Sequence, residues 1–178
     1  IFILLNLYLY MEEGIEFISN YKKIGVSGII GSCGLAAAMI TFIWSITNTS
    51  AAITLLCLAA MPFITALLGF LFLKETISIN VWAAIGIATI GIIIMSIGNY
   101  ENNTFTGFVL GIVSAVGFSV FSVSLRWRKE TPKFTTVALA GLICLLVSLI
   151  VIINKDLSIF SSSKNQALFA VHGTIVCL

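Results

Sequence analysis

Long stretches without any charged residue divide this chain into segments of membrane-spanning length. No Asp, Glu, Lys or Arg lies between Lys23 and Lys74, and further charge-free stretches cover 76–100, 102–125 and 134–154. A charge at the centre of a spanning helix costs about 2.5 to 3.5 kcal/mol on insertion scales, so polytopic membrane proteins confine charges to the connections between spans. The pattern therefore predicts an integral membrane protein.

These stretches predict an all-α fold made of membrane-crossing helices, each of which needs about twenty apolar residues. The polar cluster at 47–50 predicts a turn that divides the longest stretch into two helices. The five complete spans are predicted at 24–46, 50–73, 80–98, 105–125 and 134–153. Apolar runs at both ends of the chain predict two truncated spans, so we expect a polytopic helix bundle that is a fragment of a longer chain.

Composition agrees with the membrane prediction and argues against nucleic acid as a partner. Charged residues make up 9% of the chain, whereas roughly a quarter of residues are charged in soluble domains. The basic residues lie in short connections between apolar runs rather than on one exposed face. We therefore expect the lipid bilayer, and no nucleic acid, as a partner.

The distribution of basic residues predicts the orientation of the bundle. One set of alternate connections holds Lys22, Lys23, Lys74, Arg126, Arg128, Lys129 and Lys133, while the other set holds Lys155 and Lys164. Cytoplasmic loops of membrane proteins carry the excess of Lys and Arg. The loops 12–23, 74–79 and 126–133 are therefore predicted to be cytoplasmic in a multi-pass protein of the cell (inner) membrane.

Small residues recur at every fourth position in two spans. They are Gly107, Gly111, Ala115 and Ser119 in the span 105–125, and Gly28, Ser32 and Ala36 in the span 24–46. Such stripes let two helix backbones approach closely in lipid, where apolar burial gives no driving force between helices. The pattern favours tight helix packing, and a ligand-facing groove is the alternative.

The sequence gives no indication of an enzyme. It contains no glycine-rich phosphate loop after a strand, no HExxH or GxSxG motif and no paired carboxylates at helical spacing. The spans also bring together no set of nucleophile, base and metal ligands. We therefore expect no catalytic residues, no metal site and no cofactor.

Polar, aromatic or helix-breaking residues within the spans are candidates for a substrate path. They are Trp44, Asn48, Thr54, Pro62, Thr65, Ser114, Phe118, Ser122 and His172. For most of them the alternative roles are interfacial anchoring, a turn, or a hydrogen bond from serine to its own helix.

Two of these candidates have a specific chemical basis. Pro62 cannot offer an N–H to the carbonyl of Leu58, and a freed carbonyl inside a membrane needs a partner within the protein. A fixed kink that only shapes packing is the alternative. His172, in the last truncated span, is the sole imidazole. It is either a proton relay or substrate contact, or a neutral side chain bonded to a neighbouring backbone carbonyl.

The stretch 48–96 carries a recognisable order of features. A small polar turn precedes a span with a central proline, a hairpin of the form Leu-x-Glu-x-x-Ser follows, and a glycine-rich span comes last. The matching residues are Asn48, Pro62, Leu73, Glu75, Ser78, Trp82, Gly86 and Gly91. This order resembles the EamA domain of the drug/metabolite transporter superfamily. The stretch 105–127, with Gly107 and Gly111, looks like the start of the second repeat of that family.

The resemblance implies a carrier built from ten helices in two inverted repeats. Residues 1–100 would form the C-terminal part of the first repeat, with spans two to five, and 101–178 the N-terminal part of the second repeat, with spans six to eight. The resemblance implies a secondary carrier of small organic solutes that works by alternating access. Glu75 matches an acidic residue that recurs in the family, and we expect it to accept hydrogen bonds from helix-start N–H groups.

The complete spans contain no Asp, Glu, Lys or Arg, which predicts neutral, zwitterionic or aromatic substrates over strongly charged ones. The alternative function is a non-transporting scaffold or sensor subunit that associates through the small-residue faces, and a homodimer is compatible with either. A carrier predicts a polar cavity bounded by the spans 24–46, 50–73 and 105–125. A scaffold predicts a tight bundle with no central cavity.

Overall fold

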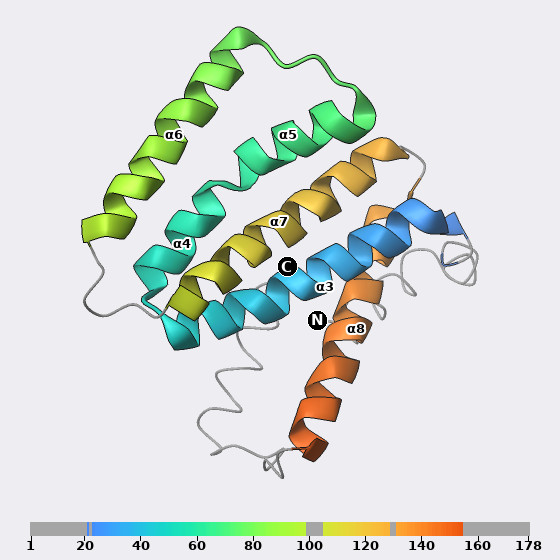
Figure 1. Cartoon of the computed structure of the whole chain (residues 1–178). Helices are drawn as coiled ribbons and strands as arrows, with labels where there is room; N and C mark the ends of the chain where they lie inside the picture. The colour runs from blue at the N-terminus through green and yellow to red at the C-terminus, as the bar shows by residue number, and fades with distance from the viewer. Residues whose placement is uncertain (1–20, 22, 99–104, 129–130, 155–178) are drawn as a thin grey trace.

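The computed structural model describes residue 21 and residues 23–98, 105–128 and 131–154, and within these ranges the chain is helical with short connections (Figure 1). The helices are α3 (Gly25–Asn48), α4 (Ala51–Ala59), α5 (Met61–Leu73), α6 (Ile79–Gly98), α7 (Phe105–Trp127) and α8 (Lys133–Asn154). The described ranges contain no strand. The prediction of an all-helical membrane protein is confirmed.

The helices begin and end within about two residues of the predicted spans. By length and composition Gly25–Asn48, Ala51–Leu73, Phe105–Trp127 and Lys133–Ile153 can each cross a membrane. The predicted span 80–98 corresponds to α6. Its segment Ile79–Gly91 is apolar but shorter than the four helices of membrane-spanning length. The truncated spans at the two chain ends, with His172, lie outside the described residues, as does most of the loop 12–23.

The helix of the predicted span 50–73 is interrupted next to Pro62, as the missing N–H of proline predicted. Helix α4 ends at Ala59, and Pro62 lies in the first turn of α5. The N–H of Ala60 reaches the carbonyls of Cys57 and Leu58, and the carbonyl of Ala60 accepts the N–H groups of Phe63 and Ile64 at 3.1 Å. A tightened turn thus replaces the missing proline N–H.

The helix break is bonded to α7 in a way that differs from the sequence expectation. The hydroxyl of Ser119 donates to the carbonyl of Met61 at 3.0 Å, whereas the expected acceptor was the carbonyl of Leu58. The physical reason is that the carbonyl of Leu58 already accepts a hydrogen bond from the N–H of Ala60. The break therefore faces α7.

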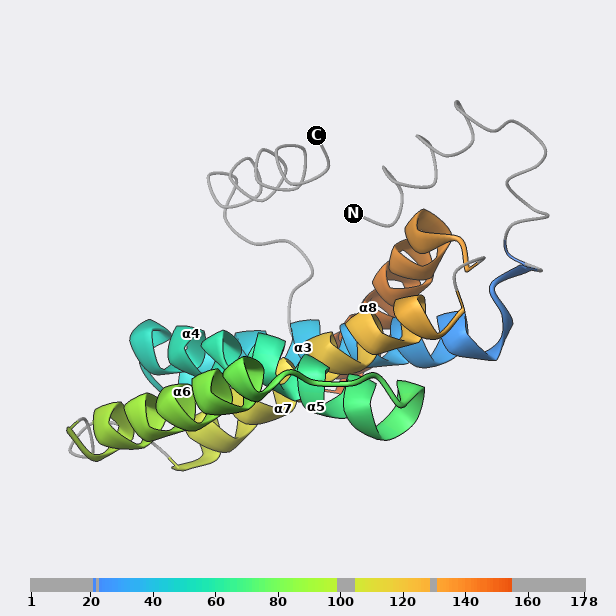
Figure 2. The same cartoon turned by 90° about the horizontal axis from the view of Figure 1, so that it is seen from above.

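Helix α3 packs against α7 on one side and α8 on another. Helices α4 and α5 contact the opposite side of α7, and α6 lies beyond α4 (Figure 1). Seen from above, α3 to α7 form one layer and α8 leaves it at an angle (Figure 2). The order across the layer is therefore α6, α4 with α5, α7 and α3.

Glycines bring α3 and α7 into backbone contact. A Cβ atom on Gly117 would lie 2.6 Å from the carbonyl oxygen of Gly34 and 2.9 Å from the Cβ atom of Ala38. A Cβ atom on Gly34 would lie 3.0 Å from the carbonyl oxygen of Gly117. Gly117 has no room for a side chain, and at Gly34 an added Cβ atom would make a tight contact with the backbone of α7.

Hydroxyl groups join α3 to α8. The Oγ of Ser27 lies 2.8 Å from the Oγ1 of Thr131, and the Oγ of Ser32 lies 2.8 Å from the carbonyl oxygens of Gly28 and Thr136. Beside these bonds, the side chains of Leu35, Ala36 and Ala140 form a small buried apolar cluster. Inter-helix hydrogen bonds of this kind supply attraction where lipid competes with apolar contacts.

Candidate substrate-binding site

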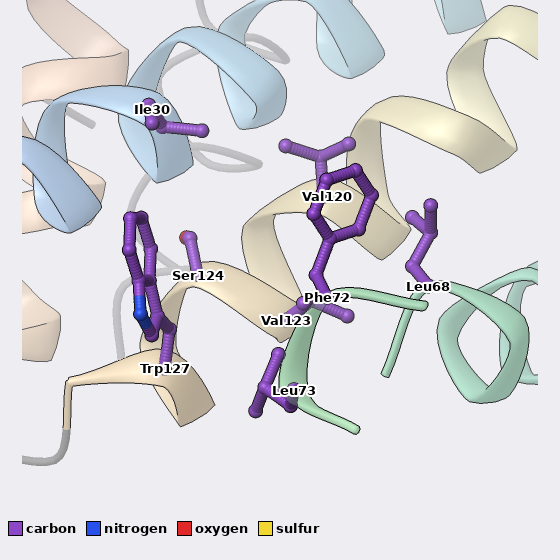
Figure 3. A pocket seen from close by; sticks show the side chains of 8 residues that line it. All are labelled: Ile30, Leu68, Phe72, Leu73, Val120, Val123, Ser124 and Trp127. Carbon is purple, nitrogen blue, oxygen red and sulfur yellow. The ribbon is translucent and has the colours of Figure 1, made fainter. Parts of the chain in front are cut away.

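A cavity of about 350 Å³ lies between α3, α5 and α7, the three predicted spans that a carrier would use. Its lining comprises Ile30, Leu68, Phe72, Leu73, Val120, Val123, Ser124 and Trp127 (Figure 3). Typical ligand pockets have about 300 to 1,000 Å³ and are mostly apolar, with a few polar groups that set orientation. The cavity has the size of a small-molecule site.

The lining is less polar than the sequence predicted. Ser124 is the one hydroxyl residue in it, and its Oγ donates to the carbonyl of Phe121 at 2.8 Å. The cavity lies at the end of the bundle where α5 and α7 finish and α3 starts, because Leu73, Trp127 and Ile30 line it together. That end is the predicted cytoplasmic side.

The polar candidates from the middle of the spans lie in helix contacts outside this cavity. The hydroxyl of Ser114 is buried and donates to the carbonyl of Ala38 at 2.9 Å. The hydroxyl of Thr54 is buried 2.8 Å from the Oγ of Ser45, which in turn donates to the carbonyl of Gly107 at 2.7 Å. These hydroxyls are satisfied between helices, which explains why the cavity is apolar.

The remaining candidates have different surroundings. Trp44 is half-exposed, and its carbonyl accepts a hydrogen bond from the side-chain amide of Asn48 at 2.7 Å. Phe118 packs against the cluster of Leu35, Ala36 and Ala140, and Ser122 is partly buried in α7. Pro62 is exposed at the helix break, whereas the hydroxyl oxygen of Thr65 is buried. His172 lies outside the described residues.

The predicted small-residue stripe of α7 faces α3 at its start and the α4–α5 break at its end. A Cβ atom on Gly107 would lie 2.6 Å from the Cβ atom of Thr49, and one on Gly111 would lie 3.0 Å from Cys57. Ala115 is fully buried, and Ser119 contacts Met61.

The predicted stripe of α3 faces α8. A Cβ atom on Gly28 would lie 3.0 Å from the Cγ2 atom of Thr131, and Ser32 bonds across to Thr136. The Sγ of Cys144 lies 3.7 Å from the carbonyl oxygen of Ala36.

A second small-residue face on each helix was missed. Ser114, Gly117 and Ser124 of α7 face α3, where they meet Ala38, Gly34 and Gly31 respectively. The spacing of three, then seven residues is that of one helix face, so the signal was present in the sequence. It was hidden because α7 carries small residues on two faces and is packed on both.

An ion pair closes the predicted cytoplasmic end beside the cavity. The guanidinium of Arg126, at the end of α7, donates to the carboxylate of Glu75, in the α5–α6 connection. The chain turns back at Lys74, which has a φ of 56° and closes α5. Glu75 was expected to accept hydrogen bonds from helix-start N–H groups, whereas the described bond of its carboxylate is with the guanidinium of Arg126 in α7.

Comparison with known proteins agrees with this architecture. Residues 1–97 match the EamA-like transporter family. The chain belongs to this family. As an EamA-like protein with long apolar helices, it is an integral membrane protein of a transporter family.

A curated relative of this EamA-like chain is an "Uncharacterized transporter" of Helicobacter pylori strain J99. The two are 28% identical over 121 residues, which cover 68% of this chain. The chain spans 39% of the length of that relative. No solved structure gave a significant match to the chain.

Proposed function

We propose that this EamA-like protein is a secondary carrier that moves small organic solutes across the membrane by alternating access. The observation that carries the proposal is the cavity between α3, α5 and α7, which has the size of a ligand site. The size and position of the cavity support a carrier over a scaffold, because a scaffold requires only packed helices, whereas its apolar lining differs from the polar cavity that a carrier was expected to have. Transport leaves the solute chemically unchanged, so no enzymatic step is needed.

The solute class follows from the charges near the path. Within the helices the charged residues are Arg126, in the last turn of α7, and Lys133, at the start of α8. The cavity lining is apolar with two aromatic rings, Phe72 and Trp127. A strongly charged solute would find no opposite charge to replace its hydration. We therefore propose neutral, zwitterionic or aromatic substrates.

The proposed motion is a rocking of two repeats about the cavity. Helices α3 to α6 would belong to the first repeat, and α7 with α8 to the second. The cavity then lies between the repeats, since it is lined from α3 and α5 on one side and from α7 on the other. The ends of α5 and α7, with Glu75 and Arg126, would face the cytoplasm.

Transport into proteoliposomes tests this function. The protein, expressed from its complete gene, is offered radiolabelled neutral, zwitterionic and aromatic solutes and a polyanion, with and without an imposed proton gradient. We expect saturable uptake from the first three classes. Strong saturable uptake of the polyanion would contradict the proposed substrate class.

A matched pair of variants tests the cavity itself. Leu68 lines the cavity, whereas its neighbour Leu67 is 40% exposed and does not. Leu68→Trp fills the space and should lower transport by about tenfold or more, which corresponds to about 1.4 kcal/mol of barrier. Leu67→Trp adds the same ring on the outside and should keep the rate within about twofold. Equal rates for both variants would place the path elsewhere.

A further inference from the structure

Ser124 is the one side-chain hydrogen-bond acceptor among the described residues that line the cavity. The other lining side chains are hydrocarbon, apart from the indole of Trp127, whose N–H can only donate. Figure 3 shows the oxygen of Ser124 pointing away from the α7 ribbon, toward the space between Trp127 and Val120. A solute in this cavity therefore meets a single side-chain oxygen.

The hydrogen of the Ser124 hydroxyl is already in use. Its Oγ lies 2.8 Å from the carbonyl oxygen of Phe121, three residues earlier in α7. A carbonyl oxygen can only accept, so the hydroxyl is the donor, and the two lone pairs of its own oxygen remain. No described residue donates a hydrogen bond to this oxygen. Ser124 thus offers acceptor capacity that no described group uses.

Gly31 of α3 gives this oxygen its room. A Cβ atom on Gly31 would lie 2.3 Å from the Oγ of Ser124, well inside van der Waals contact. The next nearest atoms of other helices, the Cγ2 of Thr136 and the Cβ of Ser124, would lie 3.4 and 3.5 Å away, which are ordinary contacts. The hydroxyl oxygen is therefore the atom that requires glycine at position 31. Ile30, the neighbour of Gly31, lines the cavity, so this contact lies at its wall.

Apolar surroundings make a single acceptor selective. An N–H or O–H group that leaves water loses its hydrogen bonds, and inside an apolar cavity it regains one only from an acceptor of the protein. A solute whose polar group can only accept gains nothing from the Ser124 oxygen, because the hydrogen of the hydroxyl is bonded to Phe121. The cavity should therefore distinguish solutes by whether they can donate a hydrogen bond.

Resting on the proposed carrier function, we propose that Ser124 determines the specificity of this cavity by accepting a hydrogen bond from an N–H or O–H group of the solute. Gly31 is a positioning residue that leaves space for the Ser124 oxygen. The rings of Phe72, from α5, and Trp127, from α7, line the same cavity and suit the flat body of an aromatic molecule. The solute class is thus neutral aromatic molecules that carry a hydrogen-bond donor.

Three molecules of nearly the same size and shape test the proposal. Indole carries an N–H donor, benzofuran has an oxygen that only accepts, and indene has neither group. The protein from its complete gene is placed in nanodiscs, and the affinities are measured by equilibrium dialysis against empty nanodiscs. Ser124→Ala should weaken indole about fivefold, the usual net effect of one neutral hydrogen bond, and leave benzofuran and indene unchanged. Ser148→Ala, at an exposed position of α8, is the control and should change none of the three.

Gly31→Ala tests the positioning role. The added methyl group displaces the Ser124 oxygen, so indole should weaken by a similar factor while indene does not, and the melting temperature should fall. Once Ser124→Ala has removed the oxygen, the methyl group has room. The double variant should therefore bind indole no more weakly than Ser124→Ala and melt above Gly31→Ala. Equal losses for all three probes, or a double variant that melts no higher than Gly31→Ala, would overturn the role of Gly31.

The possible failures can be told apart. If the wild type binds indole and Ser124→Ala binds it equally well, the role of Ser124 is wrong and the carrier cavity stands. If Ser124→Ala weakens benzofuran as much as indole, the hydroxyl donates to solutes and the donor requirement is wrong. Equal weakening of all three probes would mean that the oxygen supports the cavity wall instead of the solute. If the wild type binds none of the three, the cavity as a solute site is wrong, and this inference falls with it.

Discussion

The glycines of α7 and those of α6 lie in opposite environments. Around Gly107, Gly111 and Gly117, any added Cβ atom would meet a neighbouring helix or turn at 3.0 Å or less. Around Gly86 and Gly91 of α6, nothing lies within 4 Å of the position such an atom would take. Glycine in one helix makes a contact possible, and in the other it leaves an open surface.

The difference shows which of the two helices has packing partners on both sides among the described residues. Helix α7 is packed between α3 and the α4–α5 pair, and its glycines are buried, as are Ser114, Ser119 and Ser124. Most of the described side chains of α6 are exposed, including Ile87 and Ile90, and the ring of Trp82 makes an edge-to-face contact with Phe70 of α5, with 6.2 Å between the ring centroids. A small residue in a membrane helix therefore predicts packing only where a partner helix is present.

The largest effect is expected at the crossing of α3 and α7. Gly117→Ala would put a methyl group 2.6 Å from the carbonyl oxygen of Gly34. The obstacle is backbone, which cannot rotate away, so the free energy of unfolding should fall by about 2 to 3 kcal/mol, at the upper end for overpacking. Unfolding by SDS titration in mixed micelles measures the change. A loss below about 0.5 kcal/mol would mean that the helices do not cross at these residues.

A smaller loss is expected from one hydrogen bond across the same contact. Ser114→Ala removes the bond to the carbonyl of Ala38, which should cost about 0.6 to 1.5 kcal/mol of unfolding free energy. Ser148→Ala, at an exposed position of α8, is the matched control and should change stability by less than about 0.5 kcal/mol. Equal effects of the two substitutions would argue against a buried bond at Ser114.

Local rules were enough to predict much of this fold. Charge-free lengths determined the spans, and the missing N–H of Pro62 predicted the break between α4 and α5, because both depend on neighbouring residues. The contact of Gly34 with Gly117 was not predicted, since it depends on the register of two helices far apart in the sequence.

The residues that line the cavity were not among the candidates for a substrate path. The three helices around the cavity are the expected ones, whereas its lining is apolar. Residue type alone does not say which way a hydroxyl points. Ser114 and Thr54 satisfy carbonyl or hydroxyl groups of neighbouring helices, so they are not available to a solute at the cavity. The partner of Glu75 likewise depends on tertiary structure, because Arg126 is distant in the sequence, whereas the expected helix N–H groups are near it.

The ion pair of Glu75 with Arg126 links the connection that carries α6 to the tightly packed α7. The two side chains are 37% and 49% exposed, so solvent screens the pair and about 0.2 to 1 kcal/mol is expected from it. A double-mutant cycle with Glu75→Gln and Arg126→Gln should give this coupling in low salt and lose most of it in about 1 M salt, where the screening length is about 3 Å. Lys74→Gln is the neighbouring control. A coupling that salt leaves unchanged would indicate a buried pair.

The smallest effect, with the opposite sign, is expected on α6. Gly86→Ala adds a methyl group where nothing lies within 4 Å, so it should raise the free energy of unfolding by up to about 0.5 kcal/mol through the stiffer helix. The same substitution should therefore stabilise α6 and disrupt α7, and SDS titration of both variants measures the contrast. If Gly86→Ala instead destabilises as strongly as Gly117→Ala, a partner covers this face of α6 in the membrane. Cross-linking through a cysteine at Ile87 would then distinguish a second copy from another part of the same protein, because only a second copy doubles the mass.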